Sequence, residues 1–161
     1  MSDPKKNGQL RWLKLAVLIF IIDIISKHLV QQYLIPYQPV TVIPHFFNLT
    51  LAYNLGAAFS FLAQMGGWQQ WLFCGLAVVV AIIIVAILAR LSKQQNWLAA
   101  GLSLVLGGAL GNLYDRAAYG RVIDFFDFYL GQYHWPAFNV ADSAICVGAV
   151  LIIVLGMRGK K

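Results

Sequence analysis

Hydrophobic and polar positions divide the chain into four long apolar runs separated by more polar segments. Each run is close to the length of about 20 residues that a helix needs to cross a bilayer. The predicted membrane helices are residues 13–33, 71–89, 97–113 and 138–157. The pattern therefore predicts an all-α membrane protein with four transmembrane helices, organised as a single domain over residues 1–161.

The segment 34–67, between the first two runs, predicts a different kind of structure. It contains no Lys, Arg, Asp or Glu, and Pro36, Pro39 and Pro44 argue against a long helix. From Val40 to Phe61 the residues are rich in β-branched and aromatic types with partial alternation. We expect a small β element here, a short sheet lying on the outer membrane surface between spans one and two.

Composition excludes an ordinary soluble domain and a nucleic-acid-binding protein. Hydrophobic residues make up 60% of the chain and charged residues 11%, whereas charged residues approach a quarter of a typical soluble domain. The net charge of +6 comes from cations at the ends of the apolar runs rather than along one polar face. We therefore expect no nucleic-acid partner.

The distribution of cations predicts the orientation in the membrane. Nine of the 12 Lys and Arg flank the side that holds both termini, while only Arg116 and Arg121 lie on the other side. By the positive-inside rule both termini are cytoplasmic, and segments 34–67 and 114–137 are extracytoplasmic. The five Trp all fall at predicted span boundaries, where an indole prefers the headgroup region.

Charged residues inside apolar runs are costly, so each needs a partner or a function. Asp23 and Lys27 are one helical turn apart, and we interpret them as a structural ion pair. Asn112 and Arg116 also share a helix face. Their side chains could hold a peptide carbonyl or lock a loop, but Arg116 could equally extend to headgroups and pair with Asp115. Spacing leaves these alternatives open.

Three other acids are candidates for catalysis. Asp124 and Asp127 lie among aromatic residues, and Asp142 has no cation one turn away, although Asn139 lies there. A helix cap is the alternative for Asn139, Asp142 and Ser143. Two carboxylates close together in a low dielectric share a proton and can activate water, as in aspartyl peptidases. Spacing does not choose between Asp124 and Asp127.

No other catalytic or metal-binding set is evident in the sequence. Cys74 and Cys146 fall within apolar runs, and no Ser is placed with a His and an Asp in an elbow motif. His28, His45 and His134 are isolated and lack metal-ligand spacing. We expect no metal and no cofactor.

The chain resembles the lipoprotein signal peptidases, also called signal peptidase II, over nearly its whole length. The matching blocks are Asp23-xxx-Lys27, Asn54 to Ser60, Gly111 to Arg116, Val122 to Phe125, and Phe138 to Ser143. The resemblance implies an aspartyl endopeptidase of the bacterial inner membrane with four spans, both termini cytoplasmic, and its active site near the outer face. It also implies the catalytic pair Asp124 and Asp142, which selects Asp124 over Asp127.

The same resemblance implies a substrate and a set of supporting residues. The substrate is a prolipoprotein whose Cys carries diacylglycerol, and cleavage occurs just before that Cys. Residues implied to support the pair or bind substrate are Asn54, Gly56, Asn112, Arg116, Asn139 and Ala141, with Asp23 and Lys27 as the structural ion pair. We expect membrane lipid as a partner and a monomeric enzyme. The competing functions are a small proton- or ion-coupled transporter subunit, which would need a polar path across the membrane, and a non-catalytic scaffold.

Overall fold

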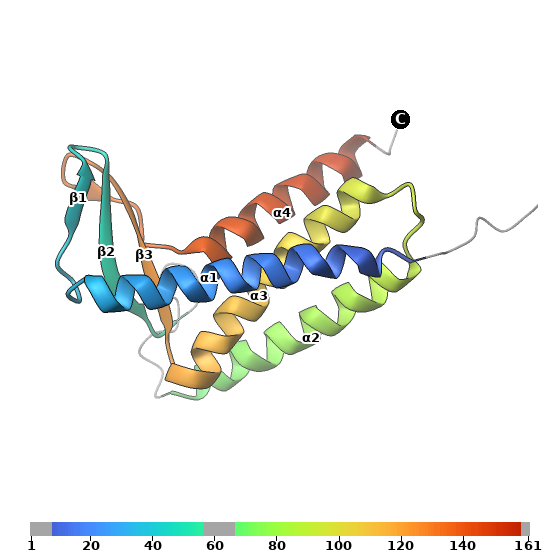
Figure 1. Ribbon diagram of the computed structural model, residues 1–161, viewed down its shortest axis with the longest axis horizontal. Helices are drawn as coiled ribbons and strands as arrows, with labels where there is room; N and C mark the ends of the chain where they lie inside the picture. The colour runs from blue at the N-terminus through green and yellow to red at the C-terminus, as the bar shows by residue number, and fades with distance from the viewer. Residues whose placement is uncertain (1–7, 57–66, 159–161) are drawn as a thin grey trace, which may run out of the picture.

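The computed structural model describes residues 8–56 and 67–158, which form four long helices and one small sheet (Figure 1). In chain order the elements are η1 Leu10–Trp12, α1 Leu13–Tyr33, β1 Val40–Ile43, β2 Phe47–Asn54, α2 Trp68–Arg90, α3 Asn96–Tyr119, β3 Val122–Leu130, β4 Tyr133–His134 and α4 Val140–Arg158. The predicted strand region extends to Phe61, and its residues 57–61 lie outside the described residues. The same holds for residues 57–66 of the predicted segment 34–67. The mostly helical fold with a small β element is confirmed.

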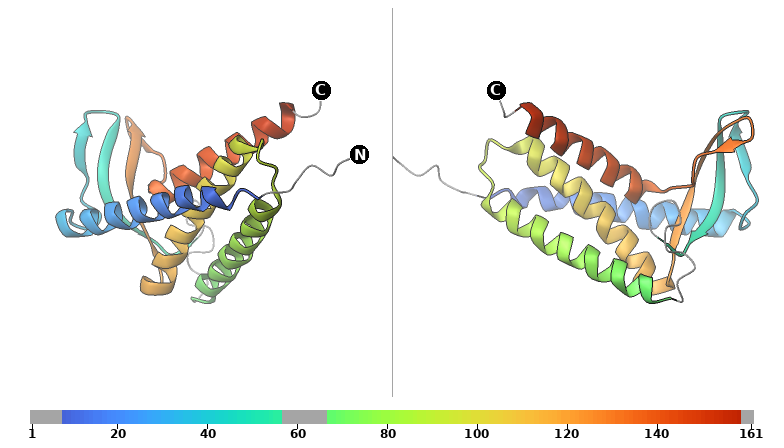
Figure 2. Two further views of the ribbon diagram at one scale, coloured as in Figure 1. Left: turned by 45° about the vertical axis from the view of Figure 1, so that its right-hand side comes forward. Right: turned by 180° about the vertical axis from the view of Figure 1, so that it is seen from behind.

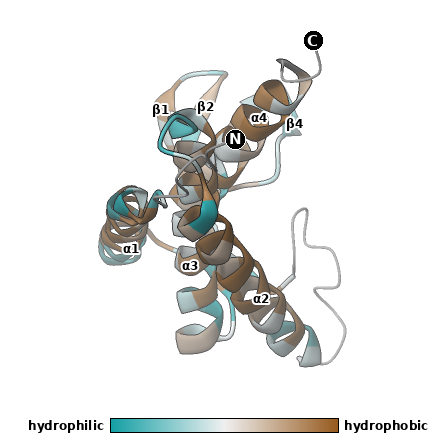
Figure 3. Ribbon diagram, turned by 90° about the vertical axis from the view of Figure 1, so that its right-hand side faces the viewer, coloured by the Kyte–Doolittle hydropathy of each residue, from teal (hydrophilic) through white to brown (hydrophobic). Residues whose placement is uncertain are grey.

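Three of the described helices are long and apolar enough to cross a membrane: α2, α3 and α4 as far as Met157. Helices α2 and α4 are coloured mostly hydrophobic in Figure 3, and they expose large apolar side chains, with Leu76 58% and Ile82 64% exposed on α2 and Ile153 61% exposed on α4. A helix that is apolar all round is either buried in protein or surrounded by lipid. Among the described residues nothing covers these apolar side chains, so the fold is that of a membrane-embedded protein. Helix α1 coincides with the first predicted run but carries Asp23 and Lys27 at its middle, both buried.

Close packing between helices depends on glycines of α3. A Cβ on Gly107 would lie 2.6 Å from the carbonyl oxygen of Ala16 on α1. A Cβ on Gly108 would collide with the carbonyl oxygen of Ala141 on α4. Small residues let helix backbones approach in membranes, where lipid supplies no hydrophobic force between helices. Helix α3 is therefore the central helix of the bundle, packed against α1, α2 and α4.

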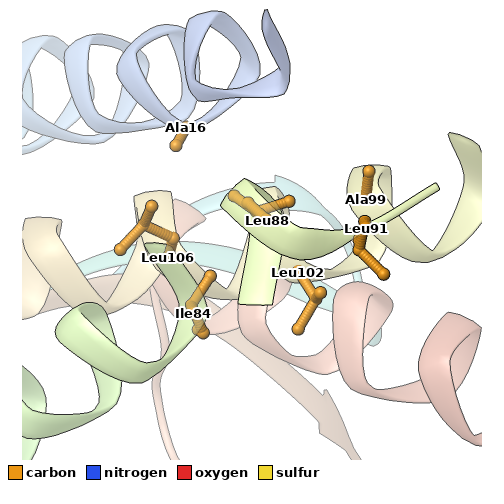
Figure 4. Packing of buried hydrophobic residues seen from close by; sticks show 7 residues of the cluster. All are labelled: Ala16, Ile84, Leu88, Leu91, Ala99, Leu102 and Leu106. Atoms are coloured by element: carbon orange, nitrogen blue, oxygen red, sulfur yellow. The ribbon is translucent and has the colours of Figure 1, made fainter. Parts of the chain in front are cut away.

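The apolar core occupies the end of the bundle away from the sheet. It combines small and branched side chains from α1, α2, α3 and the residue after α2 (Figure 4): Ala16, Ile84, Leu88, Leu91, Ala99, Leu102 and Leu106. The start of α1 and the end of α4 lie at this end, and the sheet lies at the opposite end (Figure 2). The polar residues discussed below are thereby kept to the junction of bundle and sheet.

The sheet differs from the prediction because only two of its strands come from the segment between the first two helices. Its order is β1-β2-β3-β4 with antiparallel pairs, and β3 and β4 belong to the connection between α3 and α4. A two-stranded hairpin is marginal by itself, and pairing with the nine-residue β3 enlarges it. In the β2–β3 register, Ala52 lies opposite Asp124.

Helix α3 is longer than the third predicted span, 97–113. Helix α3 runs on past residue 113 to Tyr119 and ends at Gly120, whose φ of 66° is the left-handed conformation of a helix C-terminus. The extra turns remain helical because their polar side chains are accommodated inside the protein, Asp115 being 1% exposed. The segment assigned to 114–137 therefore begins within a helix.

Candidate active site

Asp124 on β3 and Asp142 in the first turn of α4 are brought to one buried site by two asparagines. The side-chain NH₂ of Asn139 donates to Oδ1 of Asp124 at 2.8 Å. The backbone N–H of Asp142 donates to Oδ1 of Asn139 at 2.8 Å, and Asn112 Nδ2 donates to Oδ1 of Asp142 at 2.8 Å. Residues far apart in the sequence thus form one connected network around two carboxylates.

The start of α4 uses the same residues as a helix cap. The backbone N–H of Asn139 donates to Oδ2 of Asp142 at 3.3 Å, reciprocating the bond from Asp142 N–H to the Asn139 side chain. This is the arrangement of a capping box. Ser143 Oγ donates to the carbonyl oxygen of Asn139 at 2.9 Å. The helix cap considered from the sequence is therefore present. It uses Oδ2 of Asp142, and Oδ1 accepts from Asn112, so the same residue can cap the helix and take part in the site.

Lys27 is the centre of an ion cluster that fixes the orientation of Asn112. Its Nζ lies 2.7 Å from Oδ2 of Asp23 and 2.9 Å from Oδ2 of Asp115. Lys27 also donates to Oδ1 of Asn112 at 3.1 Å. Because that oxygen accepts from an ammonium, the NH₂ group of Asn112 must point the other way, toward Asp142. Sequence reasoning missed Asp115, whose neighbour Arg116 was considered as its partner instead of Lys27.

Asp23 links the ion cluster to α4 directly. Its Oδ1 accepts the backbone N–H of Ala141 at 2.9 Å, at the helix N-terminus where a carboxylate is favoured. Gly111 on α3 gives this side chain room, since a Cβ there would collide with Oδ2 of Asp23. The cluster therefore joins α1, α3 and α4 beside the two acids.

The end of β2 is held against the site by Asn54 and Arg116. Asn54 Nδ2 donates to Oδ2 of Asp124 at 3.1 Å, and the backbone N–H of Gly56 donates to Oδ1 of Asn54 at 2.9 Å. Arg116 Nη2 donates to the carbonyl oxygen of Gly56 at 3.0 Å, and Nη1 to that of Asn112 at 3.3 Å. Arg116 therefore bridges α3 to the residues that follow β2.

Burial and a neighbouring charge together raise the pKa of Asp124, which is only 3% exposed. Removal from water disfavours the ionised form, and the nearby charge of Asp142 disfavours it further. These two causes raise the pKa of Asp124 to about 7 from the ordinary 3.8, against the opposing effect of the donors Asn54 and Asn139. Near neutral pH the site can therefore hold a proton that an exposed Asp would have lost.

Asp127, the other candidate on β3, bonds within the sheet instead. Its Oδ1 lies 2.7 Å from Nδ1 of His134, and its Oδ2 accepts from Asn48 Nδ2 at 3.0 Å. The β3–β4 hairpin brings His134 to this position by pairing it with Tyr129. The interpretation of His134 as isolated was thus wrong, because strand pairing between residues near in sequence was not foreseen.

Comparison with known proteins places the chain in a family. The family model of signal peptidase (SPase) II matches residues 15–158. A lipoprotein signal peptidase of Yersinia enterocolitica is 49% identical over 156 residues, covering 97% of this chain and 92% of that protein. One of Photorhabdus laumondii is 48% identical over 154 residues, covering 96% and 92%.

Solved structures agree with this assignment. A bacterial membrane enzyme determined by the in meso method at 2.3 Å resolution matches with a TM-score of 0.85 and 30% identity, covering 99% of this chain and 97% of that one. A second, at 1.9 Å resolution, matches with a TM-score of 0.80 and 30% identity, covering 96% and 97%. Because the family model and the sequence relatives show the family, we conclude that the chain belongs to the signal peptidase II family.

Proposed function

We propose that this chain removes the signal peptide from diacylglyceryl-modified prolipoproteins, cleaving just before the lipidated Cys, with Asp124 and Asp142 as its catalytic pair. The observation that carries the proposal is the amide network that joins the buried carboxylate of Asp124 to the half-buried carboxylate of Asp142. Family membership supports the substrate class, since the relatives are lipoprotein signal peptidases. The activity is thus that of an aspartic endopeptidase.

In this mechanism the pair shares one proton and holds a water molecule. The ionised carboxylate takes a proton from the water while the water oxygen attacks the scissile carbonyl carbon. The protonated carboxyl donates its proton to the carbonyl oxygen. Collapse of the tetrahedral intermediate breaks the C–N bond, and the amine leaves with a proton from the pair. The two acids titrate as a unit. The raised pKa of Asp124 supports this chemistry near neutral pH.

Neighbouring residues orient the pair and the substrate. Asn54, Asn112 and Asn139 donate to the two carboxylates without supplying a charge. Arg116 and Gly56 hold the end of β2 beside the pair and are suited to binding the substrate backbone.

Two further elements of the site are structural. Asp23 and Lys27 form an ion pair that anchors α1 beside the active site. The backbone N–H of Ala141 is already bonded to Asp23, so Ala141 supports the pair through the position of α4.

We also propose the arrangement in the membrane. Helix α1 also crosses the membrane and brings the number of spans to four. Its 21 residues are enough for a span, and its two charges are paired inside the bundle. Both termini are cytoplasmic, as the cation distribution favours, and the sheet and active site lie at the outer face of the bacterial inner membrane. Residues 1–161 act as one monomeric peptidase domain in contact with lipid.

Cleavage of a diacylglyceryl-modified prolipoprotein by the purified protein in detergent tests the catalytic assignment. Wild type is compared with Asp124→Asn and Asp142→Asn, with chelator present throughout, and with Asp127→Asn as a matched control on the same strand. We expect both pair variants to lose cleavage while folded, and the wild type and the control to retain it with chelator present. Cleavage unaffected by either pair substitution would refute the mechanism. Absence of wild-type cleavage combined with ion flux in liposomes would favour a transporter.

A further inference from the structure

A second charged site lies at the end of the bundle opposite the carboxylates. Here the chain just before α1 meets the end of α2 and the residues that follow it (Figure 1). The pocket at this junction has a volume of about 440 Å³ and is lined by Gly8, Leu10, Arg11, Ala89 and Lys93. Nothing in the proposed peptidase mechanism uses it.

The wall of the pocket is a fixed structure. Gly8 has a φ of 64° and packs so closely that a Cβ would lie 3.0 Å from the carbonyl oxygen of Ala89. Gln9 is 0% exposed, and its backbone N–H donates to the carbonyl oxygen of Leu88 at 2.7 Å. Its side-chain NH₂ donates to the carbonyl oxygen of Ser92 at 2.9 Å. The chain before α1 is therefore bound to the α2–α3 connection.

Arg11 is held in place by neutral groups only. Its Nε donates to Oε1 of Gln9 at 3.1 Å, and its Nη2 donates to Oδ1 of Asn96 at 2.7 Å. Neither Arg11 nor Lys93 takes part in a salt bridge among the described residues. The pocket therefore presents a preoriented guanidinium and a flexible ammonium whose charges no described carboxylate neutralises.

We propose that this pocket binds the phosphate headgroup of an anionic phospholipid. A planar guanidinium with free donors matches phosphate oxygens, and a basic pocket between membrane helices suits an anionic headgroup. Trp97 lies in the first turn of α3 at the same end of the bundle and is 69% exposed, as expected for an indole at the level of the headgroups. Leu10, 46% exposed, supplies an apolar surface beside the cations. This combination favours a lipid over a free phosphate ion.

Lipid binding to the purified full chain tests this assignment, with native mass spectrometry from a non-ionic detergent as the readout. Phosphatidylglycerol is the probe, and phosphatidylcholine, glycerol 3-phosphate and inorganic phosphate are the comparison ligands. The variants are Arg11→Gln, Lys93→Gln and the double variant. Arg90→Gln is the matched control, because it removes the same charge at the same end of the bundle from a residue that does not line the pocket.

We expect phosphatidylglycerol to bind about fivefold more weakly for each pocket cation removed, from the usual contribution of one cation to anionic-lipid binding. Phosphatidylcholine should bind weakly to all forms, and Arg90→Gln should bind as wild type does. Wild-type affinity in the double variant would overturn the proposal. An equal loss in Arg90→Gln would indicate a general surface potential, and displacement of the lipid by inorganic phosphate alone would overturn the choice of a lipid.

Lys93→Gln keeps the test independent of folding. None of the described hydrogen bonds involves the Lys93 side chain, whereas Arg11 bonds to two residues. The melting temperature without lipid and the rate of prolipoprotein cleavage of Lys93→Gln should both equal those of wild type. Weaker lipid binding with those two quantities unchanged supports the site, and unchanged lipid binding by this variant refutes the role of its charge.

Discussion

Replacing Asp124 by Asn should stabilise the protein above neutral pH while abolishing cleavage. Burial and the charge of Asp142 raise the pKa of Asp124 to about 7, whereas the same group titrates near 3.8 in an unfolded chain. Between these two values the folded protein binds a proton that the unfolded chain has lost. The stability contributed by this proton is complete at low pH and is lost as the pH rises through the folded pKa.

The size of the effect follows from the two pKa values. The difference between 3.8 and about 7 corresponds to about 4 kcal/mol of unfolding free energy, at 1.36 kcal/mol for each pH unit. Roughly 2 to 3 kcal/mol of this falls between pH 5 and pH 8. Because Asn cannot ionise, the Asp124→Asn variant does not lose this unfolding free energy as the pH rises. Asn54 and Asn139 both donate to Asp124, and one of them would face an amide N–H, which costs about 1 kcal/mol at every pH.

Thermal unfolding in detergent at pH 5 and pH 8 measures this difference. For a chain of this size the wild type should lose roughly 5 to 10 °C more than Asp124→Asn between these pH values. Asp127→Asn is the control, and we expect it to lower the melting temperature because its carboxylate bonds to His134 and Asn48. Identical pH dependence in wild type and Asp124→Asn would refute the reasoning.

Three further substitutions test the packing and the network. Gly108→Ala places a Cβ against the carbonyl oxygen of Ala141, and we expect about 1 to 3 kcal/mol less stability, measured by thermal unfolding; an unchanged melting temperature would contradict this. Asn139→Ala removes a donor to the catalytic pair and a helix cap, so kcat should fall about 100-fold or more with a loss of about 1 kcal/mol in stability. A fall in stability without a fall in kcat would restrict Asn139 to capping. Lys27→Met leaves two buried carboxylates without their cation and should cost about 3 to 5 kcal/mol in unfolding free energy; wild-type unfolding would disprove the ion cluster's role.

The helices were largely predictable because uninterrupted apolar runs are a local signal. The run 13–33 and helix α1 have the same bounds, Leu13–Tyr33. Helix α3 continues to Tyr119, beyond the predicted run 97–113, although Asn112 and Asp115 are polar. They remain in a helix because Lys27, distant in the sequence, bonds to both side chains. The hydropathy pattern along the chain gives no information about this contact with Lys27.

The pairing of the sheet, and the choice of Asp124 over Asp127 as the proposed catalytic acid of β3, depend on information that is not local. The pattern after Val40 predicted strands, but nothing in it specified that β3 would pair with β2. The β2–β3 register puts Asn48 opposite Asp127 and Ala52 opposite Asp124. Asp127 thereby acquires a hydrogen-bonding partner within the sheet, and Asp124 remains available to the residues at the start of α4. Spacing alone could not distinguish the two acids, because the difference lies in their cross-strand neighbours.

In the proposed mechanism, the position of Lys27 makes a proton shared by Asp124 and Asp142 compatible with a buried cation nearby. An ammonium in direct contact with a catalytic carboxylate would favour its ionised form and remove the general acid. Instead, Asn112 stands between them, accepting from Lys27 and donating to Asp142. Lys27 is itself paired with two other carboxylates, Asp23 and Asp115. The Asn112 amide thus orients the carboxylate of Asp142 with a neutral donor instead of a cation.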